Sequence, residues 1–509
     1  MNSSSDNVWT AEHLTRSNIQ LTGANNTQKE KYKSLLKTVK NVIRETSVEP
    51  CLFMFMLCTA ISSLAVQNMH LEKACRVNFE YGDDVCDRIG RRNTTGLDEE
   101  MKEIQSLVAR VVAWKFPLQT AIPAVLVLFV GAWSDKYKKR KICILFPFVG
   151  EILCNIGLLF ATYFFKELSL TATALIEALP AAFTGSYIVI FMGMYSYMTD
   201  RTTVENRTFR LGLVTICVTA GTPTGMALSG ILLRMIGYYG VFSLLLGLHI
   251  LSLVYGVFRL EDVVRPDEEK SSCIEEKQSW RVLREVCALV GNTVLVALRP
   301  RPLGGRAQIF CVILLYLLMV GPLYGDSQVA YLYVIRKFGF TEVEYSVYGT
   351  INIVLGLLGT VFCIGMLSKR LNVQDSAIGA LAGASRIAGC FMFAFAPTRS
   401  WYYTAPLLNI FSHTGLTAVR SIATKSVSAE EVAKLSALLG VTEAIAPSIY
   451  MPSTSYIYMA TIDKFPGAFY MFDAALTVVA LGLFVVIYII VKHRLRKDEP
   501  SKTNEVSRI

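Results

Sequence analysis

The feature that most constrains this chain is a series of twelve apolar runs, each about as long as a bilayer-crossing helix. Roughly 20 apolar residues in an α-helix span about 30 Å of hydrocarbon. The runs cover residues 51–69, 111–133, 142–165, 171–198, 211–233, 240–258, 309–334, 345–367, 376–396, 401–423, 435–459 and 467–491. Because 53% of the 509 residues are hydrophobic and 18% are charged, lipid is the expected solvent. The sequence therefore predicts an all-α membrane protein with twelve transmembrane helices.

Basic residues gather in alternate connections between these runs. They occupy the N-terminal tail, residues 136–141, 201–210 and 259–306, positions 369 and 370, and the C-terminal tail. The positive-inside rule places all of these segments, and so both termini, in the cytosol. The net charge of +10 then reflects topology and attraction to anionic lipids, and it does not indicate nucleic-acid binding. A plasma membrane and an endosomal or lysosomal membrane both fit this pattern.

A polar, charge-rich segment divides the twelve runs into six and six. Two six-helix halves of this kind place a binding site near the bilayer midplane, at the interface between the repeats. The expected organisation is a cytosolic tail 1–49, an N-terminal half 50–258, a cytosolic linker 259–304, a C-terminal half 305–491 and a cytosolic tail 492–509.

The connection between the first two runs, residues 71–110, falls on the extracytosolic side. It carries the sequon Asn93-Thr94-Thr95, whose asparagine is an acceptor for glycosylation only on that side. Cys75 and Cys86 lie in the same connection, where oxidising conditions allow them to pair. We therefore predict a glycan on Asn93 and a disulfide between these two cysteines.

A short motif, Gly131-Ala132-Trp133-Ser134-Asp135, precedes a basic turn between the second and third runs. It resembles the signature of the major facilitator superfamily at this position. Val48-Glu49-Pro50 and residues 206–210, Asn-Arg-Thr-Phe-Arg, resemble segments of the proton-coupled folate transporter family, solute carrier family 46. The resemblance implies the major facilitator fold and secondary active transport of a small organic anion, folate-like or muropeptide-like, by alternating access.

The same resemblance assigns gate residues, but it does not determine whether transport is coupled to protons. Asp135 and Arg140 match the gate motif that bridges helix ends in the superfamily, and Lys139, also assigned to the gate, stands where the motif has arginine. A glutamate of the fifth helix and a histidine of the seventh serve proton coupling in the folate transporter, whereas this chain has Thr215 and Leu323 at those positions. Proton symport and folate as the substrate both stay open.

Two side chains are predicted to bind substrate because they match the family. Arg420 lies within an apolar run, where a charged side chain costs roughly 2.5–3.5 kcal/mol at the helix centre and so needs a purpose. Its planar guanidinium suits the carboxylate of an anionic substrate. Gln67, at the end of the first run, is the second match.

One helix face of the seventh run offers further polar groups. Asp326, Gln328 and Tyr331 line this face, and we predict that they bind substrate. Asp326 and Glu443 are candidates for proton coupling, since a carboxylate removed from water is easier to protonate. The alternative is that either carboxylate pairs with Arg386 and only locks helices together.

Enzyme classes find no support in the sequence. It has no H-E-x-x-H, no phosphate-binding glycine loop followed by lysine, and no paired C-x-x-C, so neither a metal nor a cofactor is expected. The expected partners are a small anionic molecule, protons and membrane lipids. A rival hypothesis is a non-transporting receptor or scaffold on a transporter fold.

Overall fold

The computed structural model describes residues 47–137, 139–202, 204–262, 305–427 and 429–506. Nearly all of the predicted N-terminal tail and linker lie outside these ranges. The chain divides into two units, Met1–Pro50 and Cys51–Ile509, and the helices that the structure describes belong to the second unit except for the first two residues of α2. The described residues form helices and connections, with no strand among them.

The N-terminal half is built from six long helices and one short one. A π-helical turn, Ala74–Asn78, and the short α3, Asp83–Gly90, follow the first long helix. The long helices are α2 (Glu49–Lys73), α4 (Asp98–Tyr137), α5 (Arg140–Tyr163), α6 (Leu170–Thr184), α7 (Ser186–Arg201) and α8 (Val204–Arg259).

The C-terminal half repeats this helical architecture. Its helices are α10 (Gly305–Phe338), α11 (Glu342–Phe362) with a π-helical continuation (Cys363–Ser368), α12 (Asp375–Phe395), α13 (Arg399–Leu408), α14 (Thr414–Lys425), α15 (Ala429–Thr461) and α16 (Ala468–Val506). Because α16 continues to Val506, it extends well beyond the end of the last predicted run, into residues expected to form a tail.

The twelve predicted runs lie mostly in helix. The tenth run, residues 401–423, is divided into α13 and α14 by a turn at residues 409–413. Two further differences involve glycine. Gly185 has φ 91° and divides the fourth run into α6 and α7, while Gly237, with φ 63°, turns the chain inside α8 without a loop. Glycine adopts positive φ without the steric cost of a Cβ. Among the described residues, nine helical segments are long and apolar enough to span a membrane.

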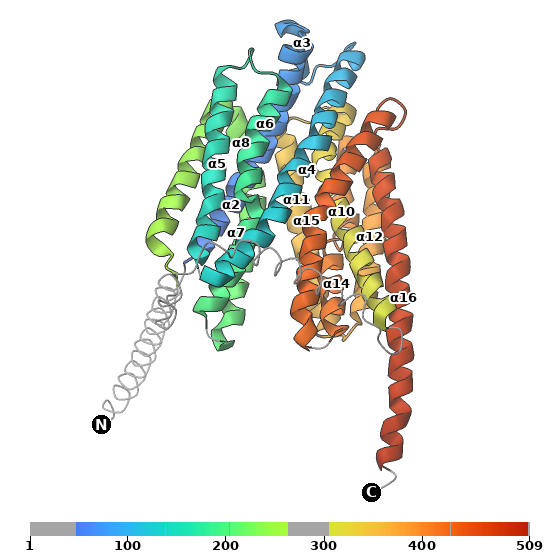
Figure 1. Ribbon diagram of the computed structural model, residues 1–509. Helices are drawn as coiled ribbons and strands as arrows, with labels where there is room; N and C mark the ends of the chain where they lie inside the picture. The colour runs from blue at the N-terminus through green and yellow to red at the C-terminus, as the bar shows by residue number, and fades with distance from the viewer. Residues whose placement is uncertain (1–46, 138, 203, 263–304, 428, 507–509) are drawn as a thin grey trace, which may run out of the picture. The chain divides into compact units, whose positions relative to one another are not determined.

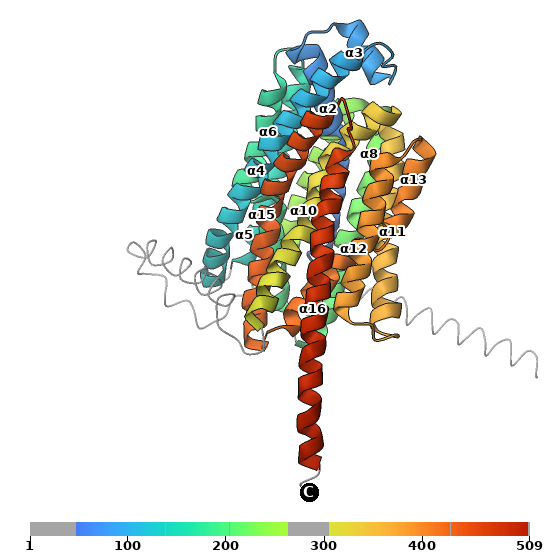
Figure 2. The same cartoon turned by 90° about the vertical axis from the view of Figure 1, so that its right-hand side faces the viewer.

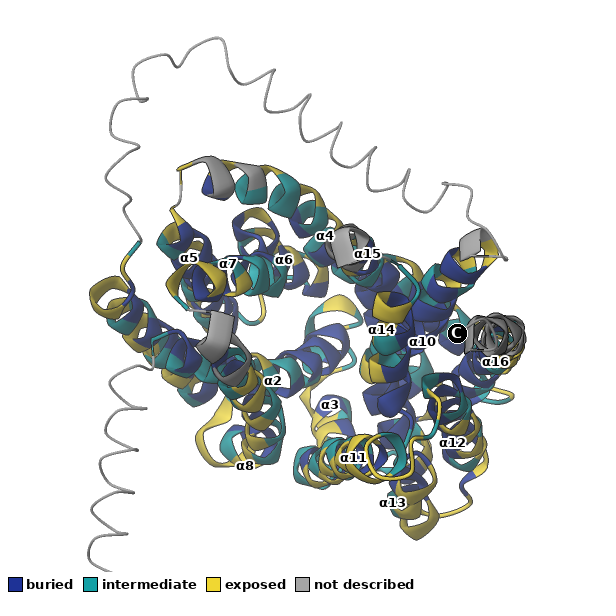
Figure 3. Cartoon of the chain, turned by 90° about the horizontal axis from the view of Figure 1, so that it is seen from below, coloured by how far each residue is buried: buried dark blue, intermediate teal, exposed yellow. Residues whose placement is uncertain are grey.

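Two groups of helices stand side by side when the protein is viewed along the helices (Figure 3). One contains α2 and α4–α8, and the other contains α10–α16. The main contacts between the groups join α4 to α15 and α8 to α11. Large apolar side chains such as Phe160, Phe183 and Ile489 are exposed, as lipid-facing residues are expected to be.

The segment around α3 lies at one end of the helices, which we call the disulfide end (Figures 1 and 2). There, Cys75 and Cys86 are joined by a disulfide, with their Cα atoms 5.8 Å apart. Asn93 is exposed, and the Thr95 hydroxyl donates a hydrogen bond to its Oδ1 at 3.4 Å. The opposite end, where α4 ends and α5 begins, is called the basic end.

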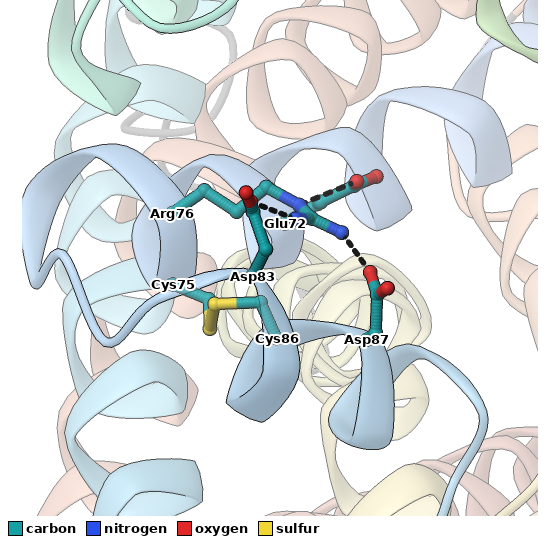
Figure 4. Close-up of a disulfide and its surroundings, with 6 residues drawn as sticks. All are labelled: Glu72, Cys75, Arg76, Asp83, Cys86 and Asp87. Carbon is teal, nitrogen blue, oxygen red and sulfur yellow. Dashed lines mark hydrogen bonds and ion pairs between the residues drawn. A yellow bond between two sulfur atoms is a disulfide. The ribbon is translucent and has the colours of Figure 1, made fainter.

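Beside the disulfide, the guanidinium of Arg76 provides a second fastening of this segment through ion pairs (Figure 4). Arg76 forms ion pairs with the carboxylates of Glu72, Asp83 and Asp87. The adjacent Lys73 donates hydrogen bonds to two backbone carbonyls of the connection after α5. The end of α2 is thus tied to α3 and to the end of α5.

Candidate functional site

The first candidate site joins three helices of the C-terminal half through Arg420. Its Nη2 lies 2.7 Å from Glu443 Oε2, and it donates to the Tyr316 hydroxyl at 2.7 Å. That hydroxyl in turn donates to Glu443 Oε2 at 2.7 Å. The Arg420 side chain is 57% exposed and that of Glu443 is 31% exposed, so the pair, on α14 and α15, is accessible.

A residue of the N-terminal half also lies near the Arg420–Glu443 pair. Tyr187 on α7 interacts electrostatically with Tyr324 on α10 and with Glu443. Tyr324 also interacts electrostatically with Arg420. We call these residues, with Tyr316, the central site. It combines an accessible guanidinium with a carboxylate and phenol groups, an arrangement suited to an organic anion with an aromatic or polar body.

Asp326, predicted to bind substrate and to carry protons, lies in a different cluster. Arg386 Nη2 on α12 is 2.6 Å from Asp326 Oδ2 on α10 and 3.3 Å from Asp473 Oδ2 on α16. The side chains of Arg386, Asp326 and Asp473 are 8%, 16% and 0% exposed, respectively. The pairing with Arg386 that the sequence left as an alternative is therefore present. We call these three residues the C-half cluster.

A second buried cluster lies in the N-terminal half. Lys115 Nζ on α4 lies 2.9 and 3.0 Å from the two carboxylate oxygens of Glu177 on α6. His70 Nε2 on α2 is 3.5 Å from the same carboxylate, and Glu151 on α5 interacts with it electrostatically. We call Lys115, Glu177 and His70 the N-half cluster. Sequence reasoning did not single out Lys115, although a lysine inside an apolar run is itself a signal.

The two halves are joined by polar contacts at the disulfide end. Arg92 Nη2 lies 2.6 Å from Glu342 Oε1 at the start of α11 and donates to the Tyr331 hydroxyl at 3.3 Å. The Tyr331 hydroxyl donates to Asn68 Oδ1 at 3.2 Å. We call these four residues the latch. Tyr331, predicted to bind substrate, is fully buried within it, and nothing in the loop sequence marks Arg92 as its partner.

A second set of contacts seals the same end. Gln105 on α4 donates its amide to the Leu332 carbonyl of α10 at 2.9 Å and accepts a hydrogen bond from the Tyr458 hydroxyl of α15 at 2.9 Å. Further along α4, the hydroxyls of Thr120 and Ser448 lie 2.7 Å apart. The halves therefore meet closely from the disulfide end down the α4–α15 contact.

The remaining predicted site residues lie apart from the central site. Gln67 is buried and donates to the hydroxyl of Ser63 at 3.1 Å, one helical turn earlier on α2. Gln328 is partly exposed on α10. Neither is among the residues that surround Arg420 in the described part of the chain.

The predicted gate motif lies at the basic end. Arg140 is buried, and it donates to Asp200 Oδ2 on α7 and to the Ser134 hydroxyl on α4, each at 2.9 Å. Lys139 is exposed just before α5. The side chain of Asp135 lies outside the described part of the chain. Asp200 and Ser134 both belong to the N-terminal half, and the role of Arg140 as a gate stays a prediction.

Comparisons with known proteins define the class to which this fold and these sites belong. Residues 52–449 match the Major Facilitator Superfamily, and the chain belongs to that family. Solved structures share its fold. A transporter of the POT family in complex with a thioalcohol-conjugated peptide superimposes with a TM-score of 0.56 at 14% identity, covering 87% of this chain and 96% of that chain. The human organic anion transporter MFSD10 gives a TM-score of 0.53 at 13% identity, with coverage of 86% and 98%.

Curated relatives narrow the class. A probable peptidoglycan muropeptide transporter of Drosophila melanogaster is 25% identical over 462 residues, which are 89% of this chain and 86% of the relative. A lysosomal proton-coupled steroid conjugate and bile acid symporter of Gallus gallus is 23% identical, with coverage of 86% and 92%. The proton-coupled folate transporter of Rattus norvegicus is 22% identical, with coverage of 70% and 74%.

These relatives confirm the predicted resemblance to solute carrier family 46. The chain is a membrane-spanning secondary transporter of small organic substrates, and the proteins it matches are transporters rather than enzymes.

Proposed function

We propose that this chain carries a small organic anion by alternating access, and that Arg420 binds the anionic group. The observation that supports this proposal most directly is the accessible Arg420–Glu443 pair, on the part of the C-terminal half that Tyr187 of the other half approaches. A guanidinium offers several donors in one plane and binds a carboxylate through two parallel hydrogen bonds. Glu443 and Tyr316 occupy those donors until a substrate replaces them.

Glu443 gives the proposed site a way to release its substrate. Its Oε2 accepts hydrogen bonds from both Arg420 and Tyr316, so a substrate carboxylate competes with it directly. This competition lets the site release its substrate, and a proton bound elsewhere on the same helices would bias it, which links anion binding to proton binding. The relatives named as proton-coupled symporters favour such a link.

The contacts between the halves support one particular state of the transport cycle. The latch and the Gln105 contacts hold the halves together at the disulfide end, while the central pair keeps access to solvent. If the basic end faces the cytosol, as the charge pattern predicts, this state is open to the cytosol. Substrate would enter from the other side only after the latch opens.

A comparison of Arg420→Lys with Arg399→Lys tests the proposed function. Arg399 makes a similar ion pair with Glu344 at the disulfide end, with side chains 50% and 37% exposed, and serves as the matched control. In proteoliposomes, Arg420→Lys should raise the KM for anionic substrates by roughly tenfold because one charged hydrogen bond is lost. Arg399→Lys should leave the KM unchanged.

The substrates to test are folates, muropeptides and conjugated steroids or bile acids. Arg420→Lys with an unchanged KM would remove this residue from the binding site. Counterflow separates carriage from the rival hypothesis, since a receptor that only binds its ligand shows none. Absence of counterflow by the wild-type protein for every anion that it binds would contradict transport.

A further inference from the structure

The C-half cluster holds two acids and one base in a place that water scarcely reaches. Asp473 is 0% exposed and Arg386 is 8% exposed. Both carboxylates approach the same nitrogen atom, Nη2 of Arg386. If both carboxylates were ionised, the cluster would carry a net negative charge inside an apolar bundle. An unbalanced charge in such surroundings is strongly unfavourable, and an ionisable group there takes up a proton instead.

In the part of the chain that the structure describes, the neighbouring helices bring no lysine or second arginine to the two carboxylates. Among the described residues, Arg386 is the only cation that acts electrostatically on Asp326 or Asp473. The other titratable groups that face the cluster are Tyr345 and Tyr348 on α11, Cys390 on α12, His413 before α14, Tyr450 on α15 and Tyr470 on α16. Tyrosine and cysteine are uncharged at neutral pH, and His413 acts on Arg386 rather than on either carboxylate, so none of these groups balances the surplus carboxylate.

The cluster also has room and unpaired polar atoms. A cavity of about 10 Å³ is lined by Arg386, Ser412 and Thr477 together with apolar side chains of α10. Among the described residues, Arg386 Nε, Ser412 Oγ and Asp473 Oδ1 are buried without a hydrogen-bond partner. A single water needs roughly 10–15 Å³ and two or more polar partners, so one water fits in this cavity. Such a water would give Arg386 Nε and Ser412 Oγ a hydrogen-bond partner, although neither aspartate lines this cavity.

We propose that Asp326 and Asp473 share one bound proton in the resting protein, and that this proton is the one that makes transport pH-dependent. Two carboxylates that share one site cannot both ionise readily, and a single proton makes the cluster neutral. In this exchange a carboxylate accepts one proton from water and becomes a neutral carboxylic acid. It returns the proton to water when it ionises.

Helix α10 links this proton to the central site. It carries Tyr316 and Tyr324, which contact or interact with Glu443, and it also carries Asp326, two residues after Tyr324. Arg386 Nη2 donates as well to the carbonyl of Pro322, at 3.5 Å, on the same helix. Loss of the proton would strengthen the pull of Arg386 on α10, next to the tyrosines of the central site. This coupling role rests on the proposed function, whereas the bound proton does not.

Infrared difference spectroscopy on the purified full-length protein, without substrate, tests the proton site. At neutral pH the wild type should show the C=O band of a buried carboxylic acid, and both Asp473→Asn and Asp326→Asn should lose it. Either substitution leaves one acid for one base, which needs no proton. Glu344→Gln, in an accessible ion pair with Arg399, is the control and should keep the band.

Retention of the band in both aspartate variants would overturn the proposal. Because this readout uses no substrate, it stays decisive even if the proposed transport function fails. In proteoliposomes, Asp473→Asn should flatten the pH dependence of uptake, while Glu344→Gln should keep the wild-type profile. A lost band together with an unaltered pH profile would overturn the coupling role alone.

Discussion

The two buried ion clusters of this transporter differ in how their charges balance. In the N-half cluster, Lys115 approaches both oxygens of one carboxylate, that of Glu177. In the C-half cluster, Arg386 offers one nitrogen to two carboxylates, those of Asp326 and Asp473. Both clusters join different membrane helices of one half. The clusters differ in the number of acids that directly contact the base: one contacts Lys115 and two contact Arg386.

This difference assigns the clusters different tasks. Lys115 matched by Glu177 holds α4 against α6, and this ion pair is neutral without a further proton. A base shared by two acids is neutral only with a proton bound, so its state follows the pH. A buried charge that is balanced by an opposite charge holds helices together. A buried charge that is not balanced favours proton binding.

The largest expected effect is on the stability of the matched pair. Glu177→Gln leaves Lys115, whose side chain is 4% exposed, without its counter-charge. Removing one partner of a buried pair costs about 3–5 kcal/mol, so thermal unfolding in detergent should occur at a clearly lower temperature. Asp473→Asn, which keeps the pair of Arg386 with Asp326, should cost far less. Equal losses in the two variants would show that the clusters are energetically alike.

The second test replaces the matched pair completely. A Lys115→Met, Glu177→Leu variant leaves no unpaired charge, and apolar replacement of a buried pair is often neutral or stabilising. It should recover most of the stability that Glu177→Gln loses and keep the wild-type pH profile of uptake. A flattened profile would mean that the N-half cluster, together with the neighbouring carboxylate of Glu151, takes part in coupling.

A smaller effect, on the conformational equilibrium, is expected for an ion pair that joins the two halves rather than helices within one half. Arg92→Gln removes the pair with Glu342, whose side chain is 21% exposed, and should shift the protein toward the state open at the disulfide end by roughly tenfold. Distances between spin labels at exposed Asp84 and Ser400 would report this shift. The same substitution at Arg399, which pairs within one half, should leave the distances unchanged.

The smallest effect concerns which side of the membrane the disulfide end faces. Asn93 is exposed beside the latch, and its glycosylation would place the disulfide end outside the cytosol. Glycosidase treatment should shift the wild-type band on a gel but not that of Asn93→Gln, and uptake should stay nearly the same in this variant. A wild-type band that does not shift would contradict the predicted glycan.

The sequence predicted the helices well because the signal for each one is local. An apolar run can be recognised wherever it occurs, and the runs lie mostly in helices, although a turn at residues 409–413 divides the tenth. The division at Gly185 and the turn at Gly237 were not predicted, since a glycine inside an apolar run also fits simple helix packing.

Pairing between side chains could not be predicted in the same way. Arg386 is separated by 60 residues from Asp326 and by 87 from Asp473, and Arg92 by 250 from Glu342. A charge inside an apolar run signals that a partner exists but not which one it is. The sequence therefore offers Arg386 as a partner of either Asp326 or Glu443 only as an alternative to substrate binding, and the ion pair that forms is the one with Asp326.

The segment around α3 has two fastenings that fail under different conditions. A reductant breaks the bond between Cys75 and Cys86 but leaves the three carboxylates around Arg76 charged. Concentrated salt screens the ion pairs but leaves the covalent bond intact. A change in redox conditions alone, or in ionic strength alone, therefore removes only one fastening. Only reductant and concentrated salt together would release the segment, and with it the support that positions Arg92 near the other half.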